Sequence, residues 1–155
     1  MAVERLFQPI KLGSIELKQR IAMAPLTRFR VNDNHEVLPM AAQYYGQRAC
    51  VPGTLLITEA TLVSKQSGGY ANVPGIYTQA QIDAWKPITE AVHKQGSFVY
   101  LQLWALGRVA DKDFAEKNGI AIKSSSATSL GEGYATPKEM TFEEIKQSAV
   151  SYTHL

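Results

Sequence analysis

The protein has 155 residues, with 16 Lys and Arg against 14 Asp and Glu, so its formal net charge at pH 7 is +2. Hydrophobic residues make up 45% and charged residues 19% of the sequence, which are ordinary globular values and exclude a disordered tail or a disulfide scaffold. The weak charge, without a dense basic stripe, gives no reason to expect nucleic-acid binding, and no segment has the roughly 18 apolar residues of a membrane span.

The first predicted element is a small β-hairpin. Two short alternating runs, residues 10–12 and 15–17, flank a connection opened by Gly13, which is typical of a type II′ turn. The next run, residues 21–27, is apolar on both alternating faces, and this pattern predicts a strand covered on both sides. Pro25 should fall at its end, because proline has no N–H for a central ladder.

The middle of the chain alternates helices and strands. The predicted order is helix 40–49, strand 54–60, helix 78–96 and strand 97–103. Pro39 suits the first turn of the first of these helices, while Thr78 and Gln81 form a capping box at the start of the second. Gly96 supplies a C-terminal stop, and Pro87 should kink or weaken the second helix locally.

A long polar region is expected at residues 111–137, and a capping box of Thr141 and Glu144 then predicts the start of another helix. The alternation of strands and helices favours a parallel sheet with right-handed crossovers, and so an α/β fold. The spacing of the strands suits either a (β/α) barrel or an open doubly wound sheet.

In parallel α/β folds, working residues gather at the carboxyl ends of the strands. The polar groups that follow the three predicted strands are those of Thr27, Arg28, Glu59, Gln102, Trp104 and Arg108. A hydroxyl, an amide, an indole and cations can hydrogen-bond and stack a flat heteroaromatic ring. The set contains no obvious acid/base pair or activated nucleophile, and the histidines and the single cysteine lack metal-ligand spacing.

Each of these residues also has a structural reading. Taken alone, Pro25 is a strand terminator, and Trp104 is more often a core residue than a ligand platform. Thr27 and Gln102 are commonly surface-facing or capping residues. Glu59 is either a carboxylate of interest or a partner for one of the arginines.

Several motifs, in order, resemble the old yellow enzymes, which are FMN-dependent ene-reductases that include the plant 12-oxophytodienoate reductases. They lie at residues 6–13, 24–28, 42–49, 56–60, 68–75 and 102–108. The resemblance covers roughly residues 6–148 and implies the N-terminal part of a (β/α)8 TIM barrel, closed at its bottom by the hairpin. Residues 1–155 would then form one partial domain of a hairpin and about three β/α units, because a complete barrel takes about 250 residues. Residues 149–155 are expected not to follow the family.

The resemblance also implies roles for single residues. Pro25, Leu26 and Thr27 would line the isoalloxazine ring of FMN, with Thr27 hydrogen-bonding near its O4/N5 edge. Ala60 stands where the family has a small residue against the ring, and Gln102 would bind the pyrimidine edge. Tyr70 and Trp104 would line the substrate side. NAD(P)H would be the reductant, and the substrate would be an activated alkene, an α,β-unsaturated aldehyde or ketone.

The family's substrate-anchoring His/Asn or His/His pair and its proton-donor tyrosine are expected beyond residue 155, so no catalytic residue is expected within the chain. The alternative is therefore a non-catalytic fragment or interaction module without enzyme activity of its own. A small-molecule enone or enal is the expected partner, with neither nucleic acid nor membrane, and the oligomeric state stays open. A lone Cys50 and the absence of a secretory-signal pattern favour a cytoplasmic location.

Overall fold

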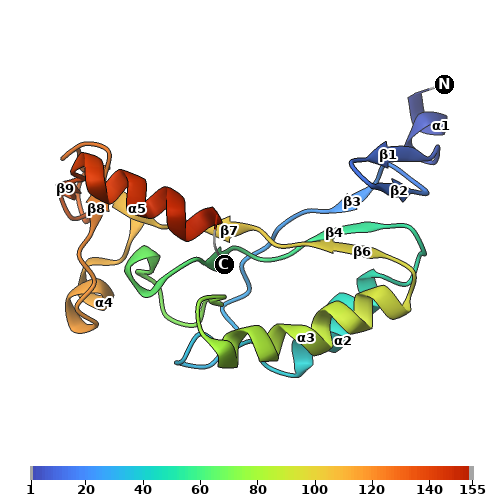
Figure 1. Ribbon diagram of the computed structural model, residues 1–155, viewed down its shortest axis with the longest axis horizontal. Helices are drawn as coiled ribbons and strands as arrows, with labels where there is room; N and C mark the ends of the chain where they lie inside the picture. The colour runs from blue at the N-terminus through green and yellow to red at the C-terminus, as the bar shows by residue number, and fades with distance from the viewer. Residues whose placement is uncertain (1, 154–155) are drawn as a thin grey trace.

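A computed structural model describes residues 2–153 of the chain. The elements follow one another along an elongated molecule (Figure 1). A hairpin lies at one end, a short parallel sheet with two helices against one face lies in the middle, and the helix α5 (Phe142–Thr153) lies at the other end.

The predicted hairpin is confirmed. After the one-turn helix α1 (Ala2–Leu6), strands β1 (Ile10–Leu12) and β2 (Ile15–Leu17) pair antiparallel. Gly13 has φ +59°, and Ser14 is not among the residues with positive φ, which matches the first and second central positions of a type II′ turn.

The central sheet is parallel, as the alternation predicts, with strand order β3-β4-β6. Its strands are β3 (Ala22–Met23), β4 (Leu55–Ile57) and β6 (Phe98–Tyr100). The expectation that residues 21–27 form a strand covered on both sides is wrong, because β3 has only two residues and Ile21 and Leu26 are 45% and 53% exposed. The strand lies at the sheet edge, and its ladder stops before Pro25, which cannot donate a hydrogen bond.

Two helices cover one face of this sheet (Figure 1). They are α2 (Met40–Arg48), which follows Pro39, and α3 (Gln79–Lys94). Their apolar faces enclose a core cluster built around the buried residues Tyr45, Leu56, Trp85, Ile88 and Val92. Burial of this apolar surface is the main force that holds the helices on the sheet.

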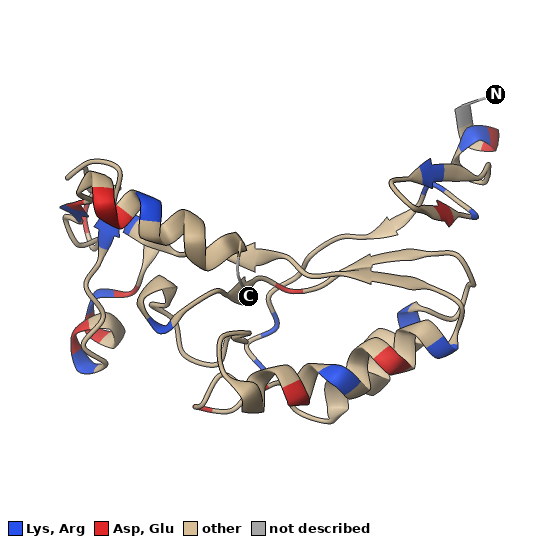
Figure 2. Ribbon diagram, viewed as in Figure 1, with Lys and Arg blue, Asp and Glu red and all other residues tan. Residues whose placement is uncertain are grey.

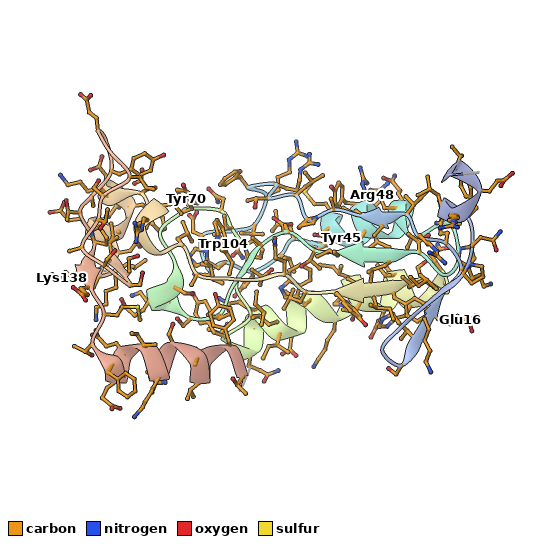
Figure 3. The ribbon with its side chains drawn as sticks, turned by 90° about the horizontal axis from the view of Figure 1, so that it is seen from above. Glu16, Tyr45, Arg48, Tyr70, Trp104 and Lys138 are labelled. Carbon is orange, nitrogen blue, oxygen red and sulfur yellow. The ribbon has the colours of Figure 1, made fainter. Side chains whose placement is uncertain are left out.

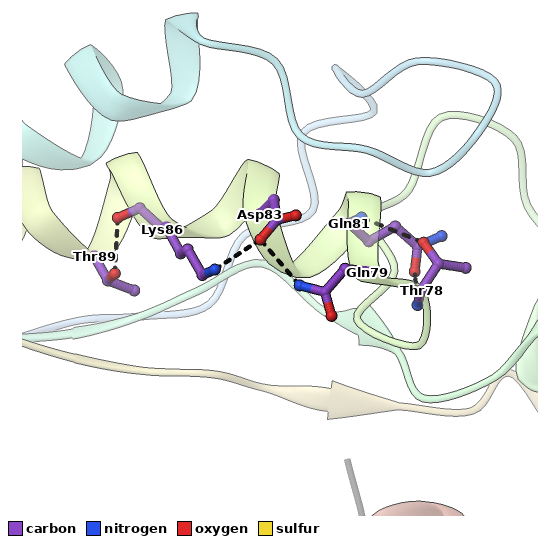
Figure 4. Close-up of polar contacts among 6 residues, drawn as sticks. All are labelled: Thr78, Gln79, Gln81, Asp83, Lys86 and Thr89. Carbon is purple, nitrogen blue, oxygen red and sulfur yellow. Dashed lines mark hydrogen bonds and ion pairs between the residues drawn. The ribbon is translucent and has the colours of Figure 1, made fainter.

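The capping box of α3 is confirmed (Figure 4). The Thr78 hydroxyl accepts a hydrogen bond from the Gln81 N–H at 3.2 Å, and Gln81 Oε1 accepts from the Thr78 N–H at 3.1 Å. The helix continues unbroken past Pro87 to Lys94, so proline does not interrupt it. It ends at Lys94, and Gly96, which follows the C-cap Gln95, has a φ of +73°, the left-handed value that suits a residue just beyond a helix.

Strands β4 and β6 are shorter than the predicted strands 54–60 and 97–103, and each is followed by a further short strand that forms a second parallel pair. After β4 comes β5 (Thr61–Leu62), and after β6 comes β7 (Leu103–Trp104). Residue Leu62 also forms a parallel bridge with Gly75. The loop from residue 63 to 78, which contains the 3₁₀ turn η1 (Lys65–Ser67), is thereby held against the sheet.

The region expected to be a polar loop contains regular structure. Within residues 111–137 lie the helix α4 (Lys112–Lys117) and the strand β8 (Lys123–Ser124). The 3₁₀ turn η2 (Gly107–Val109) directly precedes this region, and the strand β9 (Lys138–Glu139), which pairs parallel with β8, directly follows it. The capping box that begins α5 is confirmed, because Thr141 N–H donates to Glu144 Oε2 at 2.9 Å and Glu144 N–H donates to Thr141 Oγ1 at 3.3 Å. Of the segment 149–155, residues 149–153 continue α5, and residues 154 and 155 lie outside the described residues.

Charged side chains of both signs are spread over the helices and the two ends of the molecule (Figure 2). Strands β4 and β6 carry none. The strands within residues 2–153 do not close into a ring, so the molecule is a partial barrel. No helix in that range is long and apolar enough to cross a bilayer.

Candidate functional site

The ends of the three central strands lie side by side, as their parallel arrangement predicts. The Arg28 backbone N–H, one residue beyond Thr27, donates a hydrogen bond to Glu59 Oε2 at 3.2 Å. The Thr61 N–H donates to the Gln102 carbonyl oxygen at 2.9 Å. The segment at residues 59–61 therefore joins the Thr27 segment on one side to the Gln102 segment on the other.

This junction contains a β-bulge. Ile57 pairs with Tyr100 in the first ladder, and Thr61 pairs with Leu103 in the second. The chain advances four residues between the two pairs on one strand and three on the other, so one extra residue is inserted within residues 58–60. Bulges re-aim side chains and are common next to active sites, and this one includes Ala60.

Threonine hydroxyls repair the hydrogen bonding that the bulge disrupts. Thr58 Oγ1 accepts from the Gln102 N–H at 3.1 Å, in the place of a backbone carbonyl. The hydroxyls of Thr58 and Thr61 both donate to the Glu59 carbonyl oxygen, at 3.0 and 2.9 Å. Both threonines are buried, and their side chains complete the ladder that the irregular backbone leaves open.

Glu59 is the buried carboxylate of this junction, with only 5% of its surface exposed. Its own N–H donates to the hydroxyl of Tyr45 at 3.0 Å. Burial raises the pKa of the Glu59 carboxyl above its usual value, while the hydrogen bond from Arg28 and the charge of Arg28 oppose that rise. Burial also raises the pKa of the Tyr45 hydroxyl, which therefore stays neutral.

Two of the side chains predicted to hold a ligand, Thr27 and Gln102, carry polar groups that are free among the described residues. Thr27 is half-buried and Gln102 is exposed, and neither the Thr27 hydroxyl nor the Gln102 amide has a partner among the described residues. Pro25 is half-buried, and Leu26 is 53% exposed, so its apolar side chain is open. Ala60, 8% exposed, places a single methyl group between these two segments.

Tyr70 and Trp104 form an aromatic pair beside this site (Figure 3). Their ring centroids are 5.9 Å apart with planes inclined by 52°, and Phe29 lies edge-on to Tyr70 with centroids 6.2 Å apart. Both rings pack against a second core cluster that includes Leu62 and Leu106. Trp104 therefore serves partly as a core residue. Its partner Tyr70 comes from the loop at residues 63–78, which the bridge between Leu62 and Gly75 holds against the sheet.

The arginines near the strand ends have protein partners. The Arg28 guanidinium lies 5.1 Å from the centroid of the Tyr44 ring and donates to the Tyr44 hydroxyl at 3.2 Å. Arg108 donates to the hydroxyls of Ser124 and Ser126 at 2.9 and 3.2 Å. The sequence alone did not single out Tyr45, Thr58 or Thr61. A threonine that bridges two strands has the same local sequence pattern as one that only occupies a strand position, and a tyrosine on an apolar helix face looks like any other core residue.

The free groups fit a flat heteroaromatic ring with polar edges. A hydroxyl and an amide offer donors and an acceptor, and the exposed leucine, the small alanine and the aromatic pair offer apolar contact. Residues 2–153 hold no cluster of His, Cys, Asp or Glu that could bind a metal ion. The residues of this site lie at the protein surface. A cleft of about 380 Å³ lies away from them, between η1, β8 and α5.

Comparisons with known proteins show which family the chain resembles. A model of the NADH:flavin oxidoreductase / NADH oxidase family matches residues 5–154. The NADP-dependent oxidoreductase lnbE of Aspergillus flavus is 54% identical over 150 residues, which are 97% of this chain and 40% of that protein. The chanoclavine-I aldehyde reductase fgaOx3 of Penicillium roqueforti is 54% identical over 142 residues, or 91% of this chain and 38% of that protein.

The fold also matches a solved structure. The old yellow enzyme from Pichia sp. AKU4542 superposes with a TM-score of 0.89 at 42% sequence identity, over 96% of this chain and 40% of that one. The chain thus spans about 40% of the length of these relatives. The expected resemblance and the partial-barrel fold are both confirmed. Since the family model covers nearly all of its residues, the chain belongs to the NADH:flavin oxidoreductase / NADH oxidase family, as an N-terminal portion of an old yellow enzyme.

Proposed function

We propose that this chain provides the strand-end part of an FMN site in an NAD(P)H-dependent flavin oxidoreductase that reduces activated alkenes. The observation that carries the proposal is the junction at Glu59–Thr61, which holds a free hydroxyl and a free amide on either side of a small alanine. The family match supports the flavin as the flat ring that this face would bind.

Each strand end has its own part in holding the ring. Pro25 and Leu26 offer apolar contact, and Thr27 offers a hydroxyl donor, which would hydrogen-bond near the O4/N5 edge. Ala60 leaves room for close approach, and Gln102 can donate and accept at the pyrimidine edge. When bound, FMN supplies the hydride-transfer chemistry, while the protein contributes orientation and hydrogen bonds that tune the ring.

Tyr70 and Trp104 are proposed to line the substrate side. Their tilted rings form an apolar wall that carries two polar groups, the phenol hydroxyl of Tyr70 and the indole N–H of Trp104. Such a wall suits a small unsaturated aldehyde or ketone, and the similarity to a protein named as an aldehyde reductase supports this class. NAD(P)H is the proposed reductant.

A chimera tests the proposal. Residues 5–153 would replace the matching segment of the Pichia old yellow enzyme, and the product is expected to bind FMN and to reduce cyclohexenone with NADPH. Thr27→Ala and Gln102→Ala should each weaken FMN binding by about fivefold or more through the loss of hydrogen bonds. Gln79→Ala, on the exposed face of α3, is the matched control. A folded chimera that carries no flavin absorbance would refute the proposal.

A further inference from the structure

Glu59 occupies a costly position for a carboxylate. It is 5% exposed, and it forms no salt bridge among residues 2–153. A buried carboxylate without a salt bridge loses hydration that a neutral side chain of the same shape would not lose. Packing alone therefore does not explain why a carboxylate is buried at this position.

The contacts of Glu59 show what the carboxylate holds. The expectation that it pairs with an arginine is only half met, because the partner is the backbone N–H of Arg28 at 3.2 Å, whereas the Arg28 guanidinium lies against Tyr44. A hydrogen bond to a charged acceptor is roughly twice as strong as a neutral one. It fixes the main chain at the residue directly after Thr27.

The backbone of Glu59 is fixed as firmly as its side chain. Its N–H is held by the buried hydroxyl of Tyr45, and its carbonyl accepts the hydroxyls of Thr58 and Thr61. Thr58 and Thr61 in turn bind the N–H and carbonyl of Gln102. A single residue thus connects the Thr27 segment, the bulge at Ala60 and the Gln102 segment.

We infer that Glu59 is a positioning residue, whose carboxylate holds the Arg28 amide and so sets where the Thr27 hydroxyl lies relative to Ala60 and Gln102. The inference rests on the proposed function for its flavin consequence. The hydrogen bond itself can be tested in this chain without any cofactor. The Glu59 carboxylate is buried and binds the Arg28 N–H. It would therefore affect a bound ring only through the position of Thr27.

The first experiment follows the Arg28 amide by NMR in the chain itself. In the wild type, the Arg28 N–H resonance should shift with pH as the Glu59 carboxyl titrates, and Glu59→Gln should abolish that shift while keeping the fold. Glu59→Leu, which has no acceptor, should speed hydrogen exchange at Arg28 by about tenfold or more, and Glu59→Gln should largely restore protection. An Arg28 amide that ignores pH and exchanges equally in all three proteins would overturn the inference.

The second experiment asks whether Glu59 acts through Thr27. Quenching of FMN fluorescence would be titrated with the chimera described above, carrying the unchanged segment, Thr27→Ala, Glu59→Leu or both substitutions. The double variant should bind no more weakly than the weaker single variant, since both changes remove the same contact. Fully additive losses would overturn the route through Thr27.

The two proposals fail in different ways. Absence of any FMN response in the unsubstituted chimera, together with a titrating Arg28 amide in the chain itself, would contradict the proposed function and leave the positioning of the Thr27 segment supported. Should Glu59→Leu fail to fold, the inference can still be tested without it. The pH response of the Arg28 amide in the wild type and its loss in Glu59→Gln then decide whether Glu59 holds that amide.

Discussion

At the scale of single residues, the Thr58 hydroxyl takes the place of a backbone carbonyl as the acceptor for a neighbouring strand. This hydroxyl accepts the Gln102 N–H and donates to the Glu59 carbonyl, and the residue is 1% exposed. A hydroxyl in this position can be both acceptor and donor, which no apolar β-branched residue can imitate. The Thr58 hydroxyl oxygen is therefore one of the atoms that hold the bulge in place.

Thr58→Val should lower the free energy of unfolding by about 1–3 kcal/mol, because it leaves the Gln102 N–H without a partner at the end of the sheet. Urea denaturation followed by circular dichroism measures the change. Thr89→Val is the matched control, since that hydroxyl donates only to the Lys86 carbonyl on the outer face of α3, and its effect should stay within about 0.5 kcal/mol. Equal losses in the two variants would contradict the role of Thr58.

The raised pKa of Glu59 predicts how stability depends on pH. Because the folded state holds this proton more tightly than the unfolded chain, the contribution of Glu59 is fully present below its usual pKa of 4.5. It is lost as the pH rises through the folded value. Arg28 is the cation facing the carboxyl, and the Tyr45 hydroxyl, whose pKa is raised by burial, stays neutral in this range.

Glu59→Gln removes that titration and keeps an acceptor for Arg28. The variant should gain free energy of unfolding relative to the wild type as the pH rises above about 4.5, until the wild-type carboxyl is fully ionised. Urea unfolding at a series of pH values checks the direction. A difference that is constant with pH, or that shrinks as the pH rises, would show that the Glu59 pKa is not raised.

At the scale of elements, the loop that carries Tyr70 depends on a close approach between backbones. Gly69 has φ +147°, and a Cβ atom added there would lie 2.3 Å from the Cβ of Ala110. The Gly69 carbonyl accepts the Asp111 N–H at 2.9 Å, so the loop cannot move away from η2 without losing that bond. Tyr70 directly follows Gly69, so this contact fixes the backbone that carries the Tyr70 ring beside Trp104.

Gly69→Ala should therefore destabilise the protein by more than about 2 kcal/mol and disturb the Tyr70–Trp104 pair, through both overpacking and backbone strain. Thermal unfolding and tryptophan fluorescence report the two effects. Gly119→Ala serves as the control, because Gly119 also has a positive φ, +66°, but has nothing within 4 Å of an added Cβ. Its cost should be about 1 kcal/mol with the fluorescence unchanged.

At the scale of the whole molecule, apolar surface remains open at both ends. On the hairpin side, Phe7, Ile10 and Ile21 are 59%, 40% and 45% exposed, and on α5 Phe142 and Ile145 are 70% and 47% exposed. Open sheet edges and exposed apolar patches promote association between chains.

The chain is accordingly expected to associate as its concentration rises. Sedimentation velocity over a series of concentrations should show a growing share of larger species, and Ile21→Lys should shift the distribution toward the monomer, because Ile21 directly precedes the edge strand β3. Lys86→Ala, on the exposed face of α3, should leave it unchanged. A wild-type chain that stays monomeric throughout would contradict this expectation.

Local sequence determined the elements whose signals are contained in a few neighbouring residues. The hairpin at Gly13, the capping boxes at Thr78 and Thr141, the stop at Gly96 and the parallel order of strands were all predictable, since each follows from backbone preference or from the spacing of apolar residues. The meeting of Thr27, Ala60 and Gln102 segments followed from the rule that parallel strands end at one edge. Tertiary structure alone decided the exposure of β3, the bulge after β4 and the partner of Glu59, because each depends on which residues from distant parts of the chain face one another. A pattern within one strand carries no information about the register of the next, and that register is set by packing and hydrogen bonds that form only when the sheet assembles.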